Sequence, residues 1–277
     1  MPRESFKEFR QIIQGKKLEN RKKKRDWRHR IFTFLTRYIT WILVKTRITA
    51  NFITITGLLI GLLGLLLIGI GNSFFIIFGF ILLYIYYISD EVDGEVARYK
   101  KQTSIRGIYY DEIGHLFFQG WFFFSFGYSI YRINSEFLYI IFGIIATFFL
   151  IGIRTVRKIS IIAFAKGDIK NKIEIKTERS EETPSKKSFI KRIKSISINL
   201  VNAFSHTHMI TTMFFIGFLL YIYFEMVWVL ELLIISYLLF LLLVFLTFMI
   251  LKARSIEKDA LKHYEKKFLE NPIIILN

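Results

Sequence analysis

The sequence predicts an all-α integral membrane protein, with six transmembrane helices preceded by an interfacial amphipathic helix. Of the 277 residues, 53% are hydrophobic and 30 are Phe, and the mean hydropathy is +0.41. A water-soluble globule of this length does not need so much apolar surface. The net charge of +17 is unevenly distributed, because long charge-free stretches alternate with basic ones. This alternation is typical of membrane-spanning helices joined by polar loops.

The first 48 residues are predicted to form a basic arm followed by the interfacial helix. Lys and Arg are dense between residues 16 and 25, and from Trp27 to Ile42 apolar residues recur at helical spacing. Such a helix lies in the membrane surface, with its basic side chains near anionic lipid. The alternative for residues 1–25 is a solvated arm. One lysine run supports nucleic-acid binding only weakly, so no nucleic-acid partner is expected. The first 30 residues contain no apolar region typical of a cleaved signal peptide.

The membrane domain is expected to cover residues 49–252. Its six apolar stretches are 52–71, 73–89, 116–131, 137–153, 209–224 and 227–251. About 20 residues are needed to cross the hydrocarbon core, so the shorter stretches must continue into their polar flanks. Residues 90–98 and 107–115 are therefore expected to extend the second and third spans as helix. Glycines at 57, 61 and 64 of the first span are expected to serve close helix packing.

Basic residues predict the orientation of the chain. All but one of the 39 Lys and Arg lie before residue 49, between 98 and 106, between 154 and 205, or after 251. The exception is Arg132. Because basic loops remain on the cytoplasmic side, both termini and the edge that carries the aspartates are expected there. A flexible cytoplasmic linker (166–205) and a charged C-terminal tail (253–277) complete the predicted organisation.

A group of carboxylates marks the boundary between the second and third spans. On a helix, Asp90, Asp93, Gly94 and Ala97 share one face, and Gly107, Asp111 and His115 share another. A hairpin of these two helices would bring three carboxylates together, and oxygen ligands of this kind suit divalent cations that assist phosphoryl transfer. Gly94, Ala97 and Gly107 leave room for a bulky ligand, and Arg98 offers a bidentate phosphate donor. The alternative is a set of helix-end charges at the water boundary. Glu91 and Glu95 are expected to face away from the aspartates, in water or paired with basic residues of 98–106.

The spacing of these residues resembles the signature of the CDP-alcohol phosphatidyltransferases. That signature reads D-x2-D-G-x2-A-R-x8-G-x3-D-x3-D, and the chain matches it from Asp90 to Asp111, with His115 at the fourth Asp. Six spans, cytoplasmic termini and an interfacial first helix are also similar to the family. The segment Thr49–Thr54 is similar to a T-P-N-x-x-T entry to the first span, with Ala50 at the Pro position.

The resemblance implies a phospholipid-synthesis enzyme that transfers a phospho-alcohol group from a CDP-linked donor to an acceptor hydroxyl and releases CMP. It implies two Mg²⁺ or Mn²⁺ ions held by Asp90, Asp93 and Asp111. The implied nucleotide-binding residues are Gly94, Ala97, Arg98, Gly107, Asn51 and Thr54. The implied partners are a CDP-linked lipid or alcohol donor, a small alcohol or lipid acceptor, the membrane and, as is usual in the family, a second copy of the chain.

His115 departs from the family signature. In the family the fourth Asp is assigned as the base that deprotonates the acceptor. A neutral imidazole can also accept a proton at neutral pH, so His115 is expected to be the catalytic base. Two alternatives remain: a metal ligand through nitrogen, or the mark of an inactive or repurposed member, such as a membrane scaffold or transporter.

Basic residues also follow the fourth span. Arg154, Arg157 and Lys158 form an R-x-x-R-K sequence at its cytoplasmic end. They are expected either to bind a phosphate group on the acceptor or to anchor the helix as cytoplasmic charges.

Overall fold

The computed structural model describes residues 8–9, 12–13, 27–166 and 207–264, and the side chains of Arg157 and Lys158, among others near segment ends, lie outside this description. Every regular element in the described residues is helical, which confirms the predicted all-α class. The helices are α2 (Trp27–Leu43), α3 (Ala50–Gly69), α4 (Ser73–Tyr99), α5 (Ile105–Asn134), α6 (Leu138–Lys166), α9 (Thr207–Phe224) and α10 (Val227–Tyr264).

Four helical segments are long and apolar enough to cross a membrane. They are Ala50–Gly69, Ser73–Tyr99, Leu138–Val156 and Val227–Ile250, and α9 adds a shorter apolar helix, His208–Phe224. The 30 residues of α5 do not meet the same criterion, because Gln119 and several Ser, Gly and Tyr residues interrupt its apolar half. Within the described residues, the structure therefore supports a polytopic membrane protein with four candidate spans.

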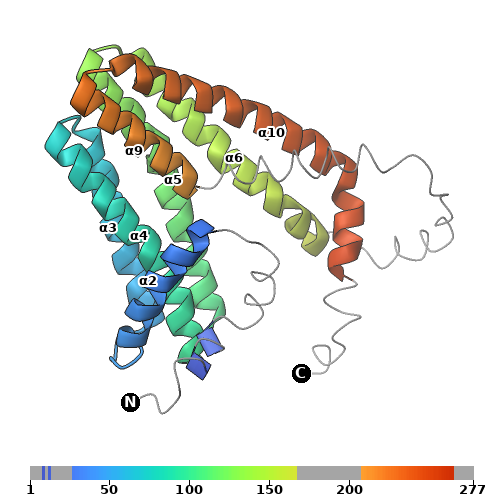
Figure 1. The fold of residues 1–277 in the computed structure, drawn as a ribbon. Helices are drawn as coiled ribbons and strands as arrows, with labels where there is room; N and C mark the ends of the chain where they lie inside the picture. The colour runs from blue at the N-terminus through green and yellow to red at the C-terminus, as the bar shows by residue number, and fades with distance from the viewer. Residues whose placement is uncertain (1–7, 10–11, 14–26, 167–206, 265–277) are drawn as a thin grey trace.

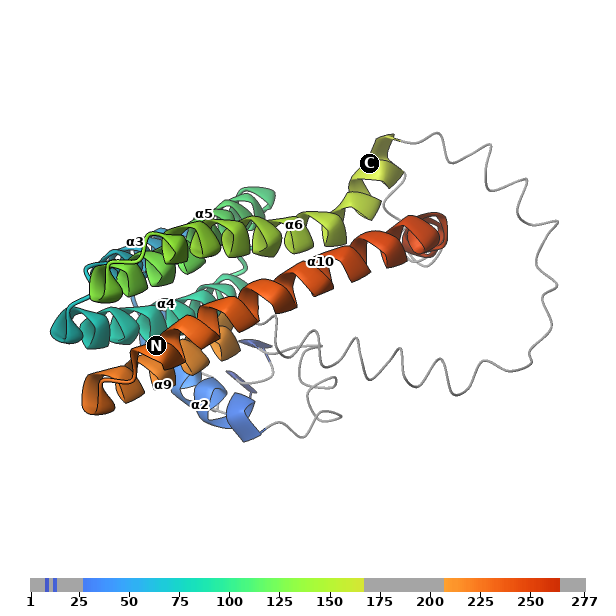
Figure 2. The same ribbon diagram turned by 90° about the horizontal axis from the view of Figure 1, so that it is seen from above.

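The helices run back and forth along a common direction. Three short connections, joining α3 to α4, α5 to α6 and α9 to α10, lie together at one end (Figure 1). α3 packs against α4 and α5, α6 packs against α5 and α10, and α9 packs against α4 and α10. α6 and α10 continue beyond the other helices at the opposite end (Figure 2). The end of α4 and the start of α5, which carry the aspartates, lie away from the short connections.

Aromatic side chains fill the interior between α4, α5 and α9. Phe80, Phe126 and Phe214 are fully buried, and the rings of Phe126 and Phe214 stack with centroids 4.4 Å apart. Lipid is as apolar as these side chains, so the helices are held together by close packing rather than by transfer out of water. Leu59 and Phe74 are exposed instead, as a lipid-facing surface requires.

Polar side chains define where the first two spans begin. Thr49 accepts a hydrogen bond of 3.3 Å from the Phe52 N–H at the start of α3, and Asn72 accepts one of 3.0 Å from the Phe74 N–H at the start of α4. Gly71, between the helices, has a φ of +79°, and a Cβ there would lie 2.6 Å from the Arg132 Cβ. The turn therefore requires glycine.

α2 turns threonines toward the protein and apolar side chains outward. Thr36 and Thr40 are fully buried, whereas Phe34, Tyr38 and Ile42 are exposed. The outward apolar face is what an interfacial helix requires, so the structure is compatible with the predicted position in the membrane surface.

The prediction that Glu95 faces water is wrong. Glu95 is 1% exposed, and its Oε2 accepts a hydrogen bond of 2.8 Å from Thr40 Oγ1. α2 packs against α4 and covers this carboxylate. The buried carboxylate thus takes its hydrogen bond from a neighbouring helix rather than from solvent, and the positive charge of Arg98 also acts on it.

The predicted polar segments are described only in part. Of the linker 166–205, only Lys166 at the end of α6 belongs to the described residues. The tail predicted from residue 253 begins as helix, because α10 continues without a break to Tyr264. Residues 265–277, and most of the basic arm before Trp27, lie outside the described part of the chain.

Candidate metal centre

Small residues on α3 let α4 approach closely beside the aspartates. A Cβ at Gly57 would overlap the Ser89 side chain, and a Cβ at Gly61 would lie 2.8 Å from the Tyr86 ring. The packing role predicted for these glycines is confirmed. The crossing places the segment of α4 that carries Tyr86 and Asp90 directly beside α3.

α4 and α5 follow one another along the chain, but α4 packs mainly against α3, and α5 packs against α6 and α3. The Lys100 Nζ donates to the carbonyl oxygens of Thr46 and Ile48, at 2.8 and 2.7 Å, and so ties the end of α4 to the segment before α3. Ser104 begins α5 by accepting a hydrogen bond of 3.0 Å from the Gly107 N–H. With both helices held against α3, their side chains meet between them.

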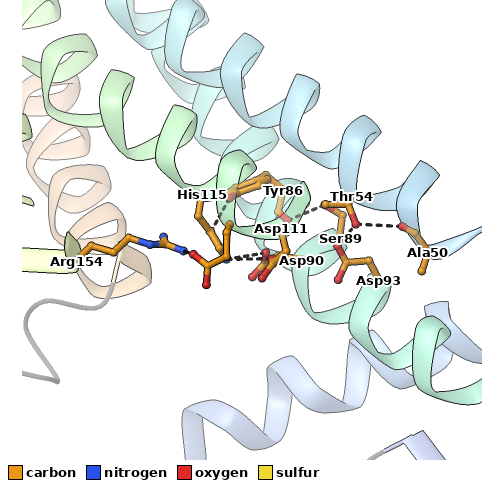
Figure 3. Close-up of polar contacts among 10 residues, drawn as sticks. Ala50, Thr54, Tyr86, Ser89, Asp90, Asp93, Asp111, His115 and Arg154 are labelled. Atoms are coloured by element: carbon orange, nitrogen blue, oxygen red, sulfur yellow. Dashed lines mark hydrogen bonds and ion pairs between the residues drawn. The ribbon is translucent and has the colours of Figure 1, made fainter. Parts of the chain in front are cut away.

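Asp90, Asp111 and His115 converge in the space between α4 and α5 (Figure 3). His115 Nε2 lies 3.4 Å from Asp90 Oδ1 and 3.3 Å from Asp111 Oδ1. One ligand atom from each residue lies within 4.8 Å of the other two, and all three side chains are partly buried. This donor set of two carboxylate oxygens and one imidazole nitrogen can hold a divalent metal ion.

Asp93 lies one turn further along α4 and takes a different partner. Thr54 Oγ1, on α3, donates a hydrogen bond of 2.5 Å to Asp93 Oδ2, and also lies 3.1 Å from the Ala50 carbonyl oxygen. Asp93 is 8% exposed and stands to one side of the cluster of Asp90, Asp111 and His115 (Figure 3). The structure therefore brings together two of the three aspartates expected to bind metal, adds His115, and pairs the third aspartate with Thr54.

Tyr86 fixes the other side of the His115 ring. Its Oη lies 3.3 Å from His115 Nδ1, and its own ring stacks on Phe118 with centroids 4.3 Å apart. Tyr86 is 5% exposed, so the packing around its ring determines where its hydroxyl lies. With Nδ1 facing Tyr86, the imidazole presents Nε2 to the two carboxylates.

The residues expected to line a nucleotide have mixed surroundings. The Arg98 side chain passes over Gly94, where a Cβ would lie 3.2 Å from Arg98 Nη1, and Arg98 Nε donates a hydrogen bond of 2.5 Å to the Ile13 carbonyl oxygen. Ala97 packs against a small buried cluster that includes Val96. The space beside Gly94 is therefore occupied by the guanidinium of Arg98, one helical turn further along α4.

Asn51 and Gly107 lie close together, although they come from α3 and α5. A Cβ at Gly107 would lie 3.4 Å from Asn51 Oδ1. The structure therefore places two of the predicted nucleotide-binding residues at one point, next to the start of α5.

Arg154 pairs with a carboxylate that the sequence reasoning did not single out. Arg154 Nη2 on α6 lies 2.7 Å from Glu112 Oε2 on α5, directly after Asp111. The pair joins α5 to α6 beside the metal-ligand cluster. The predicted partners of Arg154 in phosphate binding, Arg157 and Lys158, have no described side chains.

Two residues of the site were missed from the sequence. Tyr86 precedes Asp90 by four residues, so helical spacing alone places it on the same face. Glu112 carried no such signal, because its partner is 42 residues away on another helix. Tyr86 could therefore have been predicted from the sequence, whereas the role of Glu112 depends on how α5 and α6 pack.

No protein-family model matches this chain, and no curated protein matches it.

Proposed function

We propose that the protein is a divalent-metal-dependent membrane enzyme that transfers a phospho-alcohol group from a CDP-linked donor to an acceptor hydroxyl and releases CMP. The observation that carries the proposal is the convergence of Asp90, Asp111 and His115 between α4 and α5. Asp90 and Asp111 match the CDP-alcohol phosphatidyltransferase signature that the sequence resembles, and His115 stands at the position of its fourth Asp. Intramembrane or boundary carboxylates are costly, and a catalytic metal site gives them a function.

The proposed reaction makes one bond and breaks one bond at phosphorus. The acceptor oxygen bonds to the phosphorus of the transferred group, the bond from that phosphorus to the CMP oxygen breaks, and the acceptor proton passes to a base. Divalent cations, when bound, would neutralise the pyrophosphate and stabilise the departing CMP. Asp90 and Asp111 would hold them, with Asp93 available on the next turn of α4.

The distribution of charge favours an enzyme over a transporter. Substrate pathways of transporters usually carry ionisable residues near mid-membrane. Here Asp90 and Asp93 belong to the last part of α4 and Asp111 to the first part of α5, and these parts of the two helices lie away from the three short connections (Figure 1). In the proposed arrangement, α5 and α9 complete six spans, the end away from these connections faces the cytoplasm, and a soluble acceptor or donor meets its lipid partner there.

The proposal is tested by measuring CMP release from labelled CDP-diacylglycerol with a panel of alcohols, using purified protein in lipid nanodiscs. We expect activity with Mg²⁺ or Mn²⁺ that EDTA removes. Asp90→Asn should lower CMP release about 100-fold or more, the effect typical of removing a group that stabilises transition-state charge. Glu91→Gln makes the same change at the adjacent position and should retain activity. Equal activity of the two variants would contradict the assignment.

A non-catalytic membrane protein descended from such enzymes is the competing function. The specific observation in its favour is His115, whose two ring nitrogens both face groups of the site rather than an incoming acceptor. Thermal unfolding separates the two functions. An enzyme should be stabilised by Mn²⁺ and further by a cytidine nucleotide, because ligands stabilise the folded state that binds them. A repurposed protein should show no effect of the nucleotide.

A further inference from the structure

We propose that His115 is a metal ligand through Nε2, that Tyr86 holds the ring in the ligating orientation, and that the site consequently prefers Mn²⁺ to Mg²⁺. The inference rests on the proposed function, which supplies the reason for a metal ion at this site. Of the roles that the sequence left open for His115, it selects the metal ligand through nitrogen over the expected catalytic base.

The distances around Nε2 match coordination better than ion pairing. Charge-assisted N–H···O hydrogen bonds are about 2.7–2.9 Å long, whereas His115 Nε2 lies 3.4 and 3.3 Å from its two carboxylate oxygens. Two ligand atoms, each about 2.1 Å from one ion and separated by 90–110°, lie about 3.0–3.4 Å apart. The observed separations are those of neighbouring ligands around a common ion.

The separation between the Asp90 and Asp111 ligand atoms requires at most a small side-chain movement to suit one ion. The ligand atoms of Asp90, Asp111 and His115 all lie within 4.8 Å of one another. Oxygens on opposite sides of an ion would lie about 4.2 Å apart, given bonds of about 2.1 Å. The Asp111 side chain is 45% exposed, so its carboxylate has room to rotate slightly and bring its oxygen closer to the other two ligand atoms.

Tyr86 supplies the hydrogen bond that a ligating imidazole needs. A metal-bound His almost always donates its other ring N–H to an acceptor, which fixes the tautomer and the ring orientation. With Nε2 on the metal, Nδ1 carries the hydrogen and donates to Tyr86 Oη, 3.3 Å away. Stacking on Phe118 and contact with Gly61 hold the Tyr86 ring in place before any ion binds.

The same contacts argue against His115 as the acceptor base. A base needs a nitrogen lone pair directed at the acceptor hydroxyl. Nδ1 faces buried Tyr86, and Nε2 faces the gap between Asp90 and Asp111. Both nitrogens are therefore committed within the site.

Nitrogen ligation changes the preferred ion. Mg²⁺ is bound mainly through oxygen and demands near-ideal octahedral geometry, whereas imidazole raises the affinity of first-row transition ions. A site with two carboxylates and one imidazole should therefore favour Mn²⁺ over Mg²⁺ more strongly than the same site with a third carboxylate. His115→Asp provides that comparison within the same chain.

The test measures Mn²⁺ and Mg²⁺ binding to the purified full-length protein by calorimetry, and detects nitrogen ligation by pulsed electron paramagnetic resonance of bound Mn²⁺. We expect ¹⁴N coupling in the wild type and none in His115→Asp. The Mn²⁺ to Mg²⁺ affinity ratio should fall about 10-fold or more in that variant. Tyr86→Phe should weaken Mn²⁺ binding about 10- to 100-fold, the usual effect of losing a hydrogen bond to a ligand, but should have no further effect in the His115→Asp background.

Tyr87→Phe is the matched control, because the Tyr87 hydroxyl bonds to Thr211 on α9 instead of His115. It should leave Mn²⁺ affinity unchanged. Bound Mn²⁺ without ¹⁴N coupling, or no Mn²⁺ binding at all, overturns the inference. If His115→Asp does not fold, the wild-type spectrum decides alone. The readout needs no turnover, so ¹⁴N coupling in a protein that releases no CMP would refute the proposed function and leave this inference standing.

Discussion

Two hydroxyl groups determine which way the central side chains of the site face. Thr54 has one hydroxyl hydrogen and two acceptors within reach, the Asp93 carboxylate at 2.5 Å and the Ala50 carbonyl oxygen at 3.1 Å. The shorter contact holds Asp93 toward α3. Tyr86 acts on the other side and turns the His115 Nε2 toward Asp90 and Asp111. Neither hydroxyl is a metal ligand, yet each selects the orientation of a residue that can be one.

Gly61 is predicted to be necessary for the position of Tyr86. A Cβ at residue 61 would lie 2.8 Å from the Tyr86 ring, so Gly61→Ala must displace either the ring or α3. We expect this variant to lower Mn²⁺ affinity about 10-fold, as other losses of support to a ligand do, and to lower the midpoint of thermal unfolding.

Gly120→Ala is the control for this prediction. Outside the backbone of α5 itself, no atom of the described residues lies within 4 Å of a Cβ at residue 120, and Ala is favoured over Gly within a helix by about 0.5–1 kcal/mol. The control should keep its Mn²⁺ affinity and unfold at the same temperature or slightly higher. Wild-type behaviour of Gly61→Ala would show that the Tyr86 ring is not held by this contact.

At the level of elements, α2 is attached to α4 by a buried polar contact rather than by apolar packing alone. Thr40 is the hydrogen-bond donor to Glu95, and both residues are buried. A buried charged group without its partner costs much more than an exposed one. The contact therefore fixes where α2 crosses α4, close to the turn that carries Asp93.

Thr40→Val is predicted to destabilise the protein, because valine has the same shape but cannot donate to Glu95. We expect a loss of about 1–3 kcal/mol, the cost of leaving a buried acceptor unsatisfied. The measurement is thermal unfolding in detergent, where each kcal/mol corresponds to a shift of roughly 2–4 °C. Thr40→Ser keeps the hydroxyl and should be close to wild type. A valine variant as stable as the serine variant would mean that Glu95 finds another donor.

Glu95 and Asp90 show what could be predicted from the sequence and what could not. The helices, and the face shared by Asp90 and Asp93, follow from local periodicity, which the backbone geometry imposes. Spacing also placed Glu95 on another face of α4. Whether water or a helix covers that face depends on α2, whose crossing point is set by tertiary packing. For the same reason the sequence did not predict that Thr54 draws Asp93 to α3, or that Glu112 pairs with Arg154.

For the whole molecule, the basic segments and the candidate metal site are expected to lie on the same side of the membrane. Among the described residues, only one Lys or Arg lies near the short connections at the opposite end, namely Arg132 in the last turn of α5. The carboxylates lie at the end that contains the basic segment 98–106. The positive-inside rule predicts that this end faces the cytoplasm. The orientation follows only if α5 crosses the membrane, and α5 does not meet the criterion of length and apolar content that four other helical segments meet.

Labelling on either side of α5 tests whether α5 spans the membrane and which side of the membrane the carboxylates face. The chain contains no cysteine, so each introduced thiol is the single reactive one. Gln102 before α5 and Glu136 after it are exposed. In sealed vesicles, a membrane-impermeant maleimide should label Gln102→Cys only from the cytoplasmic face and Glu136→Cys only from the opposite face. Labelling of both from one face would mean that α5 does not span, and the reversed pattern would place the carboxylates outside. The second result would separate the site from cytosolic nucleotide and exclude the proposed reaction at this end of the molecule.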